Sequence, residues 1–146
     1  PVILAIHPDE LRFIRPSFVK AAIEEAMNAS IPVCIHLDHG SSLAQIVEAI
    51  RYGFTSVMMD ASLYPLEENI AICKKIAEIA HAVNVSVEGE LGTIGVTDPE
   101  AETGSEEIIY TNPDDVETFV KATGVDALAV AICHLHSARL RMLESQ

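Results

Sequence analysis

Residues 31–60 read IPVCIHLDHGSSLAQIVEAIRYGFTSVMMD, and this stretch predicts a strand–helix–strand unit. The β-branched, apolar run over residues 31–38 is typical of a buried strand, and apolar residues at helical spacing follow from Leu43. Gly53 stands where the C-terminal cap of that helix is expected, and a second apolar run begins at Thr55. Strands joined by a helix in this way lie parallel in one sheet.

The same alternation continues in both directions along the chain. Apolar face residues of the first helix are expected to include Phe18 and Met27, and the last helix is expected to open with Asn112 as N-cap and to close near Gly124. In all, the sequence predicts strands over residues 1–7, 31–38, 55–60, 85–90 and 127–133, and helices over 16–29, 43–52, 66–83 and 113–123.

Repeated strand–helix alternation with short connections predicts an α/β fold with a parallel sheet. A (β/α)8 TIM barrel and an open doubly wound sheet both fit this pattern. The open sheet lacks support because no G-x-G-x-x-G segment follows the first strand and no G-x-x-x-x-G-K-[ST] segment occurs. A complete barrel needs roughly 200 residues or more. We therefore expect a partial barrel of about five parallel strands and four helices, whose first strand at Pro1 lacks its upstream partner.

Charge and composition indicate which kinds of binding partner the protein can have. The 146 residues carry a formal net charge of −13, which argues against nucleic-acid binding but leaves room for a small phosphorylated substrate. Three scattered cysteines, Cys34, Cys73 and Cys133, indicate free thiols in a reducing compartment. No apolar run has membrane-spanning length, so we expect a cytoplasmic protein with no membrane partner.

Acidic and imidazole side chains recur where the predicted strands end. These positions fall on His36, Asp38 and His39, on Asp60, on Glu88 and Glu90, and on His134 and His136. The C-terminal ends of parallel strands meet at one edge, and converging His, Asp and Glu side chains suit a divalent metal. Taken singly, each has a plain alternative: Asp60 as a helix cap, a lone histidine as a structural residue, the two glutamates as an exposed strand end. The recurrence favours a metal site.

The segment over residues 92–107 is polar and longer than the roughly 2–6 residues usual for such a connection. Long connections at this edge of a sheet are commonly functional lids, although a surface insertion is the alternative.

Several motifs together resemble the class II, zinc-dependent fructose- and tagatose-bisphosphate aldolases. The segment HLDHG over 36–40 is similar to that family's signature, and further similar segments follow in the same order. They are SVMMDAS at 56–62, EEN at 67–69, VSVEGELGTIG at 85–95, IYT at 109–111 and TGVDALAVAI at 123–132.

The resemblance implies roles for individual residues. Asp38 falls on the catalytic aspartate that exchanges a proton with the aldehyde oxygen, and His39 falls on a zinc ligand. Asp60 and Glu90 fall on carboxylates for a second or alternative cation position, and His136 falls by count on a further zinc histidine. Weaker candidates for the carboxylate base of a mobile loop are Asp98 and Glu100.

The function implied is reversible cleavage of fructose 1,6-bisphosphate to dihydroxyacetone phosphate and glyceraldehyde 3-phosphate, a lyase reaction of glycolysis and carbohydrate metabolism. The alternatives are tagatose-bisphosphate cleavage, a non-catalytic remnant of such an enzyme, and an unrelated phosphate-binding α/β module. The implied cofactor is Zn²⁺, with a possible second divalent or monovalent cation. The implied partner is a sugar phosphate, and the full-length parent is expected to form a homo-oligomer.

The resemblance is weaker after residue 132. Ser137 stands where the family has a glycine, and residues 133–146 are expected to be a divergent tail, as a reading-frame change would produce. Residues 1–146 are thus interpreted as an incomplete aldolase barrel domain, in which 1–132 resembles the family. Such a fragment is expected to be weakly active or inactive.

Overall fold

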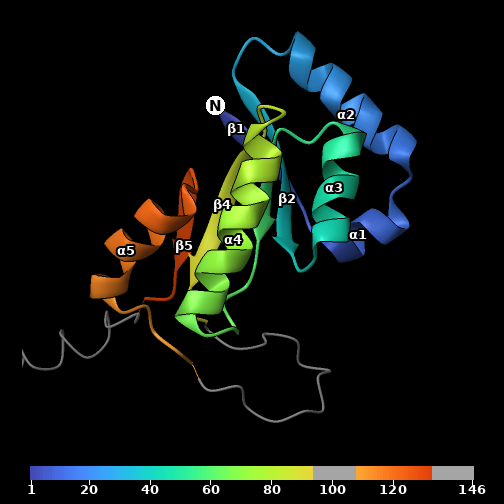
Figure 1. The fold of residues 1–146 in the computed structure, drawn as a ribbon. Helices are drawn as coiled ribbons and strands as arrows, with labels where there is room; N and C mark the ends of the chain where they lie inside the picture. The colour runs from blue at the N-terminus through green and yellow to red at the C-terminus, as the bar shows by residue number, and fades with distance from the viewer. Residues whose placement is uncertain (94–107, 133–146) are drawn as a thin grey trace, which may run out of the picture.

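The computed structural model describes residues 1–93 and 108–132. Within these residues the chain forms one sheet of five parallel strands in the order β1-β2-β3-β4-β5, with helices between them (Figure 1). The strands are β1 (Val2–Ile6), β2 (Val33–Gly40), β3 (Ser56–Met59), β4 (Ser86–Leu91) and β5 (Ala127–Val130); the helices are α1 (Pro8–Phe13), α2 (Pro16–Asn28), α3 (Leu43–Tyr52), α4 (Leu66–His81) and α5 (Pro113–Thr123). Sequential parallel order confirms the prediction of a partial barrel.

Local sequence explains where these helices begin and end. The Ser42 hydroxyl accepts a hydrogen bond from the Gln45 N–H at the start of α3, and Asn112 caps α5 in the same way through the Asp114 N–H. Gly53 and Gly124 end α3 and α5 in the left-handed conformation, at φ 99° and 71°. Glycine adopts this conformation at low cost because it has no Cβ.

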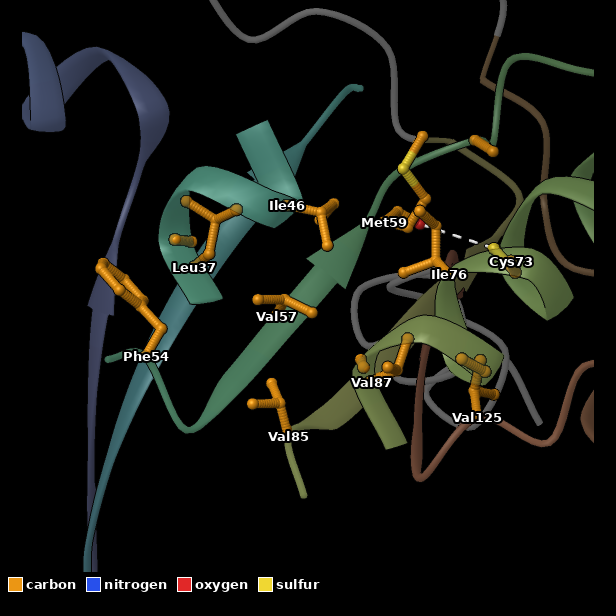
Figure 2. Close-up of a cluster of buried hydrophobic side chains, with 14 of the residues drawn as sticks. Leu37, Ile46, Phe54, Val57, Met59, Cys73, Ile76, Val85, Val87 and Val125 are labelled. Carbon is orange, nitrogen blue, oxygen red and sulfur yellow. Dashed lines mark hydrogen bonds between the residues drawn. The ribbon is translucent and has the colours of Figure 1, made fainter. Parts of the chain in front are cut away.

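The core lies between the sheet and the helices. Outward-facing strand residues Leu37, Val57 and Val87 are fully buried, and Ile46 of α3 and Ile76 of α4 cover them (Figure 2). Alternate residues of the same strands face the other way, toward the barrel axis. That inner face carries polar side chains. The ionisable residues of the strands therefore lie on the side of the sheet opposite the apolar layer that packs against the helices.

Two features differ from the sequence-based expectation. Helix α1 was not predicted, although His7, Pro8 and Glu10 supply a capping box: the His7 Nδ1 accepts from the Asp9 N–H, and Glu10 Oε2 accepts from the His7 N–H. Six residues are too few for periodicity to show.

The second difference concerns the face of α2. Phe18 and Met27 are 59 % and 82 % exposed, whereas Val19 is the residue of this helix that is fully buried. The helix packs chiefly on β2 and α3 along a narrow stripe. No described residue covers Phe18 or Met27.

Candidate metal centre

A break in the β2–β3 pairing places His39 at the C-terminal edge of the sheet. The register shifts between Leu37 and Gly40, and His39 adopts φ 52°, a left-handed conformation that few non-glycine residues take. Gly40 is packed so closely that a Cβ there would lie 2.8 Å from the Met58 carbonyl oxygen and 2.9 Å from Ile46 Cδ1. The bulge therefore turns the His39 imidazole toward β3 and β4.

Gly40→Ala should displace this bulge, and we expect it to lower the free energy of unfolding by about 1–3 kcal/mol, the usual cost of overpacking. Zinc affinity should fall with it because His39 moves. Gly124→Ala is the matched control: no atom lies within 4 Å of an added Cβ there, so it meets only the strain of a positive φ, and zinc affinity should not change. Denaturant unfolding and zinc titration check both variants. Equal zinc affinity in Gly40→Ala and wild type would contradict the bulge's role.

Three side chains from three adjacent strands meet at this edge. The His39 Nδ1–H donates to Asp60 Oδ2 at 3.0 Å, and Glu90 Oε2 lies 3.9 Å from the same ring nitrogen. Ligand atoms of His39, Asp60 and Glu90 all lie within 4.8 Å of one another. Asp38 Oδ1 approaches the other ring nitrogen, Nε2, at 3.8 Å, and its side chain is 39 % exposed.

Asp60 is held by two neighbours at once. Its Oδ1 accepts hydrogen bonds from the Ser62 N–H at 3.1 Å and the Ser62 hydroxyl at 2.7 Å, while Oδ2 faces His39. Burial acts to raise the pKa of the carboxyl, but the bonds from His39 and Ser62 outweigh it and lower that pKa. Helix α4 takes Pro65 as its N-cap, so capping of α4 does not explain Asp60. Asp60 is thus an ionised carboxylate held in a fixed direction, as a metal ligand would need to be.

The pKa of the His39 imidazole shifts in the opposite direction to that of Asp60. Burial acts to lower its pKa, but the hydrogen bond with Asp60 and the negative charges of Asp38, Asp60 and Glu90 raise it above the ordinary value. A positive charge is therefore favoured among these carboxylates.

Glu90 is the clearest sign that the cluster suits a cation. Its side chain is 14 % exposed, and its buried Oε2 has no hydrogen-bond partner among the described residues. Burial, followed by the negative charge of Asp60, raises the pKa of Glu90 to about 7. A divalent cation would satisfy this oxygen and remove the repulsion, and an imidazole with carboxylates is a donor set that zinc accepts. The residues present therefore fit a metal.

The raised pKa of Glu90 predicts how the metal-free protein responds to pH. Folded protein keeps the Glu90 proton up to about pH 7, whereas the unfolded chain releases it near 4.5. Stability should thus fall as pH rises through this window, by up to about 3 kcal/mol at about 1.4 kcal/mol per pKa unit. Glu90→Gln should remove most of this loss, while the exposed Glu24→Gln on α2 should leave it. Urea unfolding of metal-free protein from pH 5 to 8 tests this; parallel pH profiles for wild type and Glu90→Gln would contradict it.

Buried polar residues next to the cluster bond to the strands that carry it. The Asn69 side chain, 2 % exposed, donates from Nδ2 to the Glu90 carbonyl at 2.8 Å and so joins α4 to β4. His36 lies inside the sheet, one level beneath the cluster: its Nε2 is 3.3 Å from Glu88 Oε2, and its Nδ1 is 2.8 Å from the Ser56 hydroxyl. Because the carboxylate can only accept, the neutral ring donates from Nε2 and accepts at Nδ1. Glu88 is therefore a partner of His36 rather than a free strand end.

The sequence candidates divide into two groups. Asp38, His39, Asp60 and Glu90 come together as expected, and their chemical roles stay predictions. His136, Asp98 and Glu100, together with His134 and Ser137, lie outside the described residues. The pairing of His36 with Glu88 and Ser56 was not foreseen, because spacing along the chain shows which residues share a face of the sheet but not which side chains on that face reach one another.

A parallel half-barrel with a His–Asp–Glu cluster at the C-terminal ends of its strands defines a TIM-barrel protein with a candidate metal centre at the end where barrel enzymes hold their active sites. Comparison with protein-family models matches residues 1–143 to fructose-bisphosphate aldolase class-II. The chain belongs to the class II fructose-bisphosphate aldolase family.

Individual relatives agree with this assignment. A fructose-bisphosphate aldolase of Staphylococcus aureus is 45 % identical over 140 residues, which are 93 % of this chain and 48 % of the relative, and one of Giardia intestinalis is 44 % identical over 94 % and 42 %. Among solved structures, the YdjI aldolase of Escherichia coli matches with a TM-score of 0.78 at 34 % identity, covering 90 % of this chain and 46 % of that one. The chain thus spans about half the length of its relatives.

The family match reaches residue 143 and so includes most of the segment that was set apart as a divergent tail. The boundary at residue 132 stays a prediction. Among the described residues, no helix is long and apolar enough to cross a membrane.

Proposed function

We propose that the full-length protein carrying this chain is a zinc-dependent ketose-bisphosphate aldolase. Its reaction is the reversible cleavage of fructose 1,6-bisphosphate to dihydroxyacetone phosphate and glyceraldehyde 3-phosphate. The observation that carries the proposal is the cluster of His39, Asp60 and Glu90, with an unsatisfied Glu90 oxygen, beside the partly exposed carboxylate of Asp38. Names of relatives at 44–45 % identity support the same chemistry.

His39 and His136 would hold the zinc ion, and Asp60 and Glu90 would serve a second or alternative position of the cation. When bound, zinc supplies a Lewis acid for the substrate carbonyl, so no Schiff-base lysine is required. Hydrogen bonds to Ser62 and Asn69 keep the Asp60 side chain and the Glu90 backbone in place.

Proton transfer is assigned to two carboxylates. As the bond between C3 and C4 of the ketose breaks, Asp38 accepts the proton of the C4 hydroxyl. The oxygen on C4 then becomes the aldehyde oxygen. The electron pair left on C3 takes a proton from an acid in the segment that follows β4 in the sequence, where Asp98 and Glu100 are the candidates. Asp38 follows the buried residues His36 and Leu37 on β2 and is itself partly exposed, which suits a group that must contact the substrate.

The second candidate substrate is tagatose 1,6-bisphosphate, which differs from the fructose compound at one stereocentre. A coupled triose-phosphate assay of the zinc-loaded full-length protein with each sugar tests the proposal. We expect turnover that a chelator abolishes and zinc restores. Chelator-resistant turnover, or zinc-loaded protein that cleaves neither sugar, would refute it. The predicted homo-oligomer and cytoplasmic location belong to the same proposal and are checked by light scattering and by fractionation.

A further inference from the structure

His7 directly follows β1 and lies beside the metal cluster, where its side chain, which caps α1, has a free edge. The β1–β2 register pairs Ala5 with His36 and Ile6 with Leu37, so His7 continues the strand one residue beyond the last pair, level with Asp38. Its backbone is still extended, at φ −73° and ψ 149°. Alternation therefore puts the His7 side chain on the inner face, as Ala5 and His36 are. Its ring centroid lies 6.2 Å from that of His39.

Local contacts fix both the orientation and the tautomer of this ring. His7 Nδ1 accepts the Asp9 N–H at 3.2 Å, as the cap of α1, and this bond orients the ring. The His7 backbone N–H donates to Glu10 Oε2 at 3.0 Å, a bond that does not involve the imidazole. The Asp9 carboxylate is 3.6 Å from Nδ1, too far for a hydrogen bond. Since Nδ1 is an acceptor, the neutral ring carries its proton on Nε2. That N–H has no partner among the described residues, and the side chain is 44 % exposed.

The groups around the His7 Nε2–H are mainly hydrogen-bond acceptors. Besides the two imidazoles, the ionisable side chains that the described strand ends place here are the carboxylates of Asp38, Asp60 and Glu90, which accept hydrogen bonds but cannot donate them when ionised. A sugar phosphate presents phosphate oxygens, which carboxylates repel, and hydroxyl oxygens, to whose lone pairs an ionised carboxylate cannot donate. A fixed N–H donor at the edge of the cluster is suited to hold such an oxygen.

We propose that His7 positions the substrate by donating a hydrogen bond from Nε2–H to one of its oxygens on the β1 side of the metal centre. The inference rests on the proposed function and adds a residue to it. The ring is preset by the cap of α1, so little side-chain freedom is lost when the bond forms.

His7→Asn is the sharpest test, because asparagine keeps a capping oxygen for the Asp9 N–H but cannot place a donor where Nε2 lies. In the zinc-loaded full-length protein we expect KM for fructose 1,6-bisphosphate to rise about tenfold, with kcat, zinc content and Tm near wild type. Tenfold corresponds to about 1.4 kcal/mol, the size expected for the loss of one hydrogen bond. Inhibition by inorganic phosphate tells the two oxygen types apart: it weakens in His7→Asn if the contact is to phosphate and is unchanged if the contact is to a hydroxyl.

Glu10→Ala is the matched control. It removes half of the capping box but keeps the imidazole, so Tm should fall while KM stays unchanged. An equal rise of KM in Glu10→Ala and His7→Asn would show that His7 acts only through α1, and an unchanged KM in His7→Asn would overturn the proposal directly. His7→Thr, which also caps, replaces His7→Asn if that variant fails to fold.

Calorimetric titration of dihydroxyacetone phosphate separates failure of this inference from failure of the proposed function. Wild-type protein that binds this compound but cleaves neither bisphosphate refutes the function alone, and tighter binding by wild type than by His7→Asn then still supports His7. Equal affinity of the two proteins refutes His7, and wild-type protein that neither binds nor cleaves refutes both.

Discussion

Asp38→Ala should lower kcat of the full-length protein by about 10²-fold or more while leaving its zinc content unchanged. A positioned proton-transfer group contributes about 10²–10⁴-fold, and Asp38 is next to the metal cluster without belonging to it: its nearest approach is 3.8 Å to His39 Nε2. Its side chain is partly exposed, so removing it leaves no cavity in the core. Steady-state kinetics and metal analysis of the same sample give both quantities.

His39→Ala should behave differently from Asp38→Ala. It removes the imidazole that faces both Asp60 and Glu90, so zinc should be lost together with turnover, and added zinc should not restore either. Asp126→Ala serves as the control for loss of a carboxylate. Asp126 accepts the Val87 N–H at 2.8 Å and the His81 Nε2–H at 2.9 Å at the other end of β4, so its loss should lower Tm without changing zinc content or kcat. Loss of zinc in Asp38→Ala would show that Asp38 is a ligand instead.

Features of the fold and site that depend on residues close together in the sequence could be predicted from it. Asn112 with Pro113, and Gly53 and Gly124, mark helix ends through contacts within four residues, and the structure has those ends where they were predicted. Parallel order followed from strand–helix alternation. The positions of Asp38, Asp60 and Glu90 at strand ends followed from where each apolar run stops.

Features that depend on three-dimensional neighbours were missed. The left-handed His39 and its bulge arise because Gly40 packs against Met58 and Ile46. No sequence pattern around Gly40 indicates these contacts. Helix α1 was missed because its cap is a histidine, an uncommon capping residue, and because six residues show no period. That omission also hid His7, whose ring is oriented by the same cap.

Residues 1–146 alone, with zinc added, should turn over fructose 1,6-bisphosphate at least about 10³-fold more slowly than the full-length protein. The described strands form one open sheet with β1 and β5 at its edges, and the chain spans about half the length of its relatives. Half of a barrel offers a bound sugar phosphate contacts from one side only. Orientation of reacting groups alone can contribute about 7–11 kcal/mol, far more than this loss of rate requires.

The same chain should also associate with itself, because the edge strands carry exposed apolar residues: Ile3 on β1 is 68 % exposed and Val130 on β5 is 42 % exposed. Size-exclusion chromatography with light scattering should detect species larger than a monomer, and Ile3→Lys should reduce them by placing a charge at the β1 edge. Phe13→Lys is the control, since Phe13 is 87 % exposed but belongs to helix α1 and not to an edge strand. Chelator-sensitive turnover by a monomeric chain, at a rate near that of the full-length protein, would show that five strands suffice for catalysis and that the second half of the barrel contributes little to orienting the substrate.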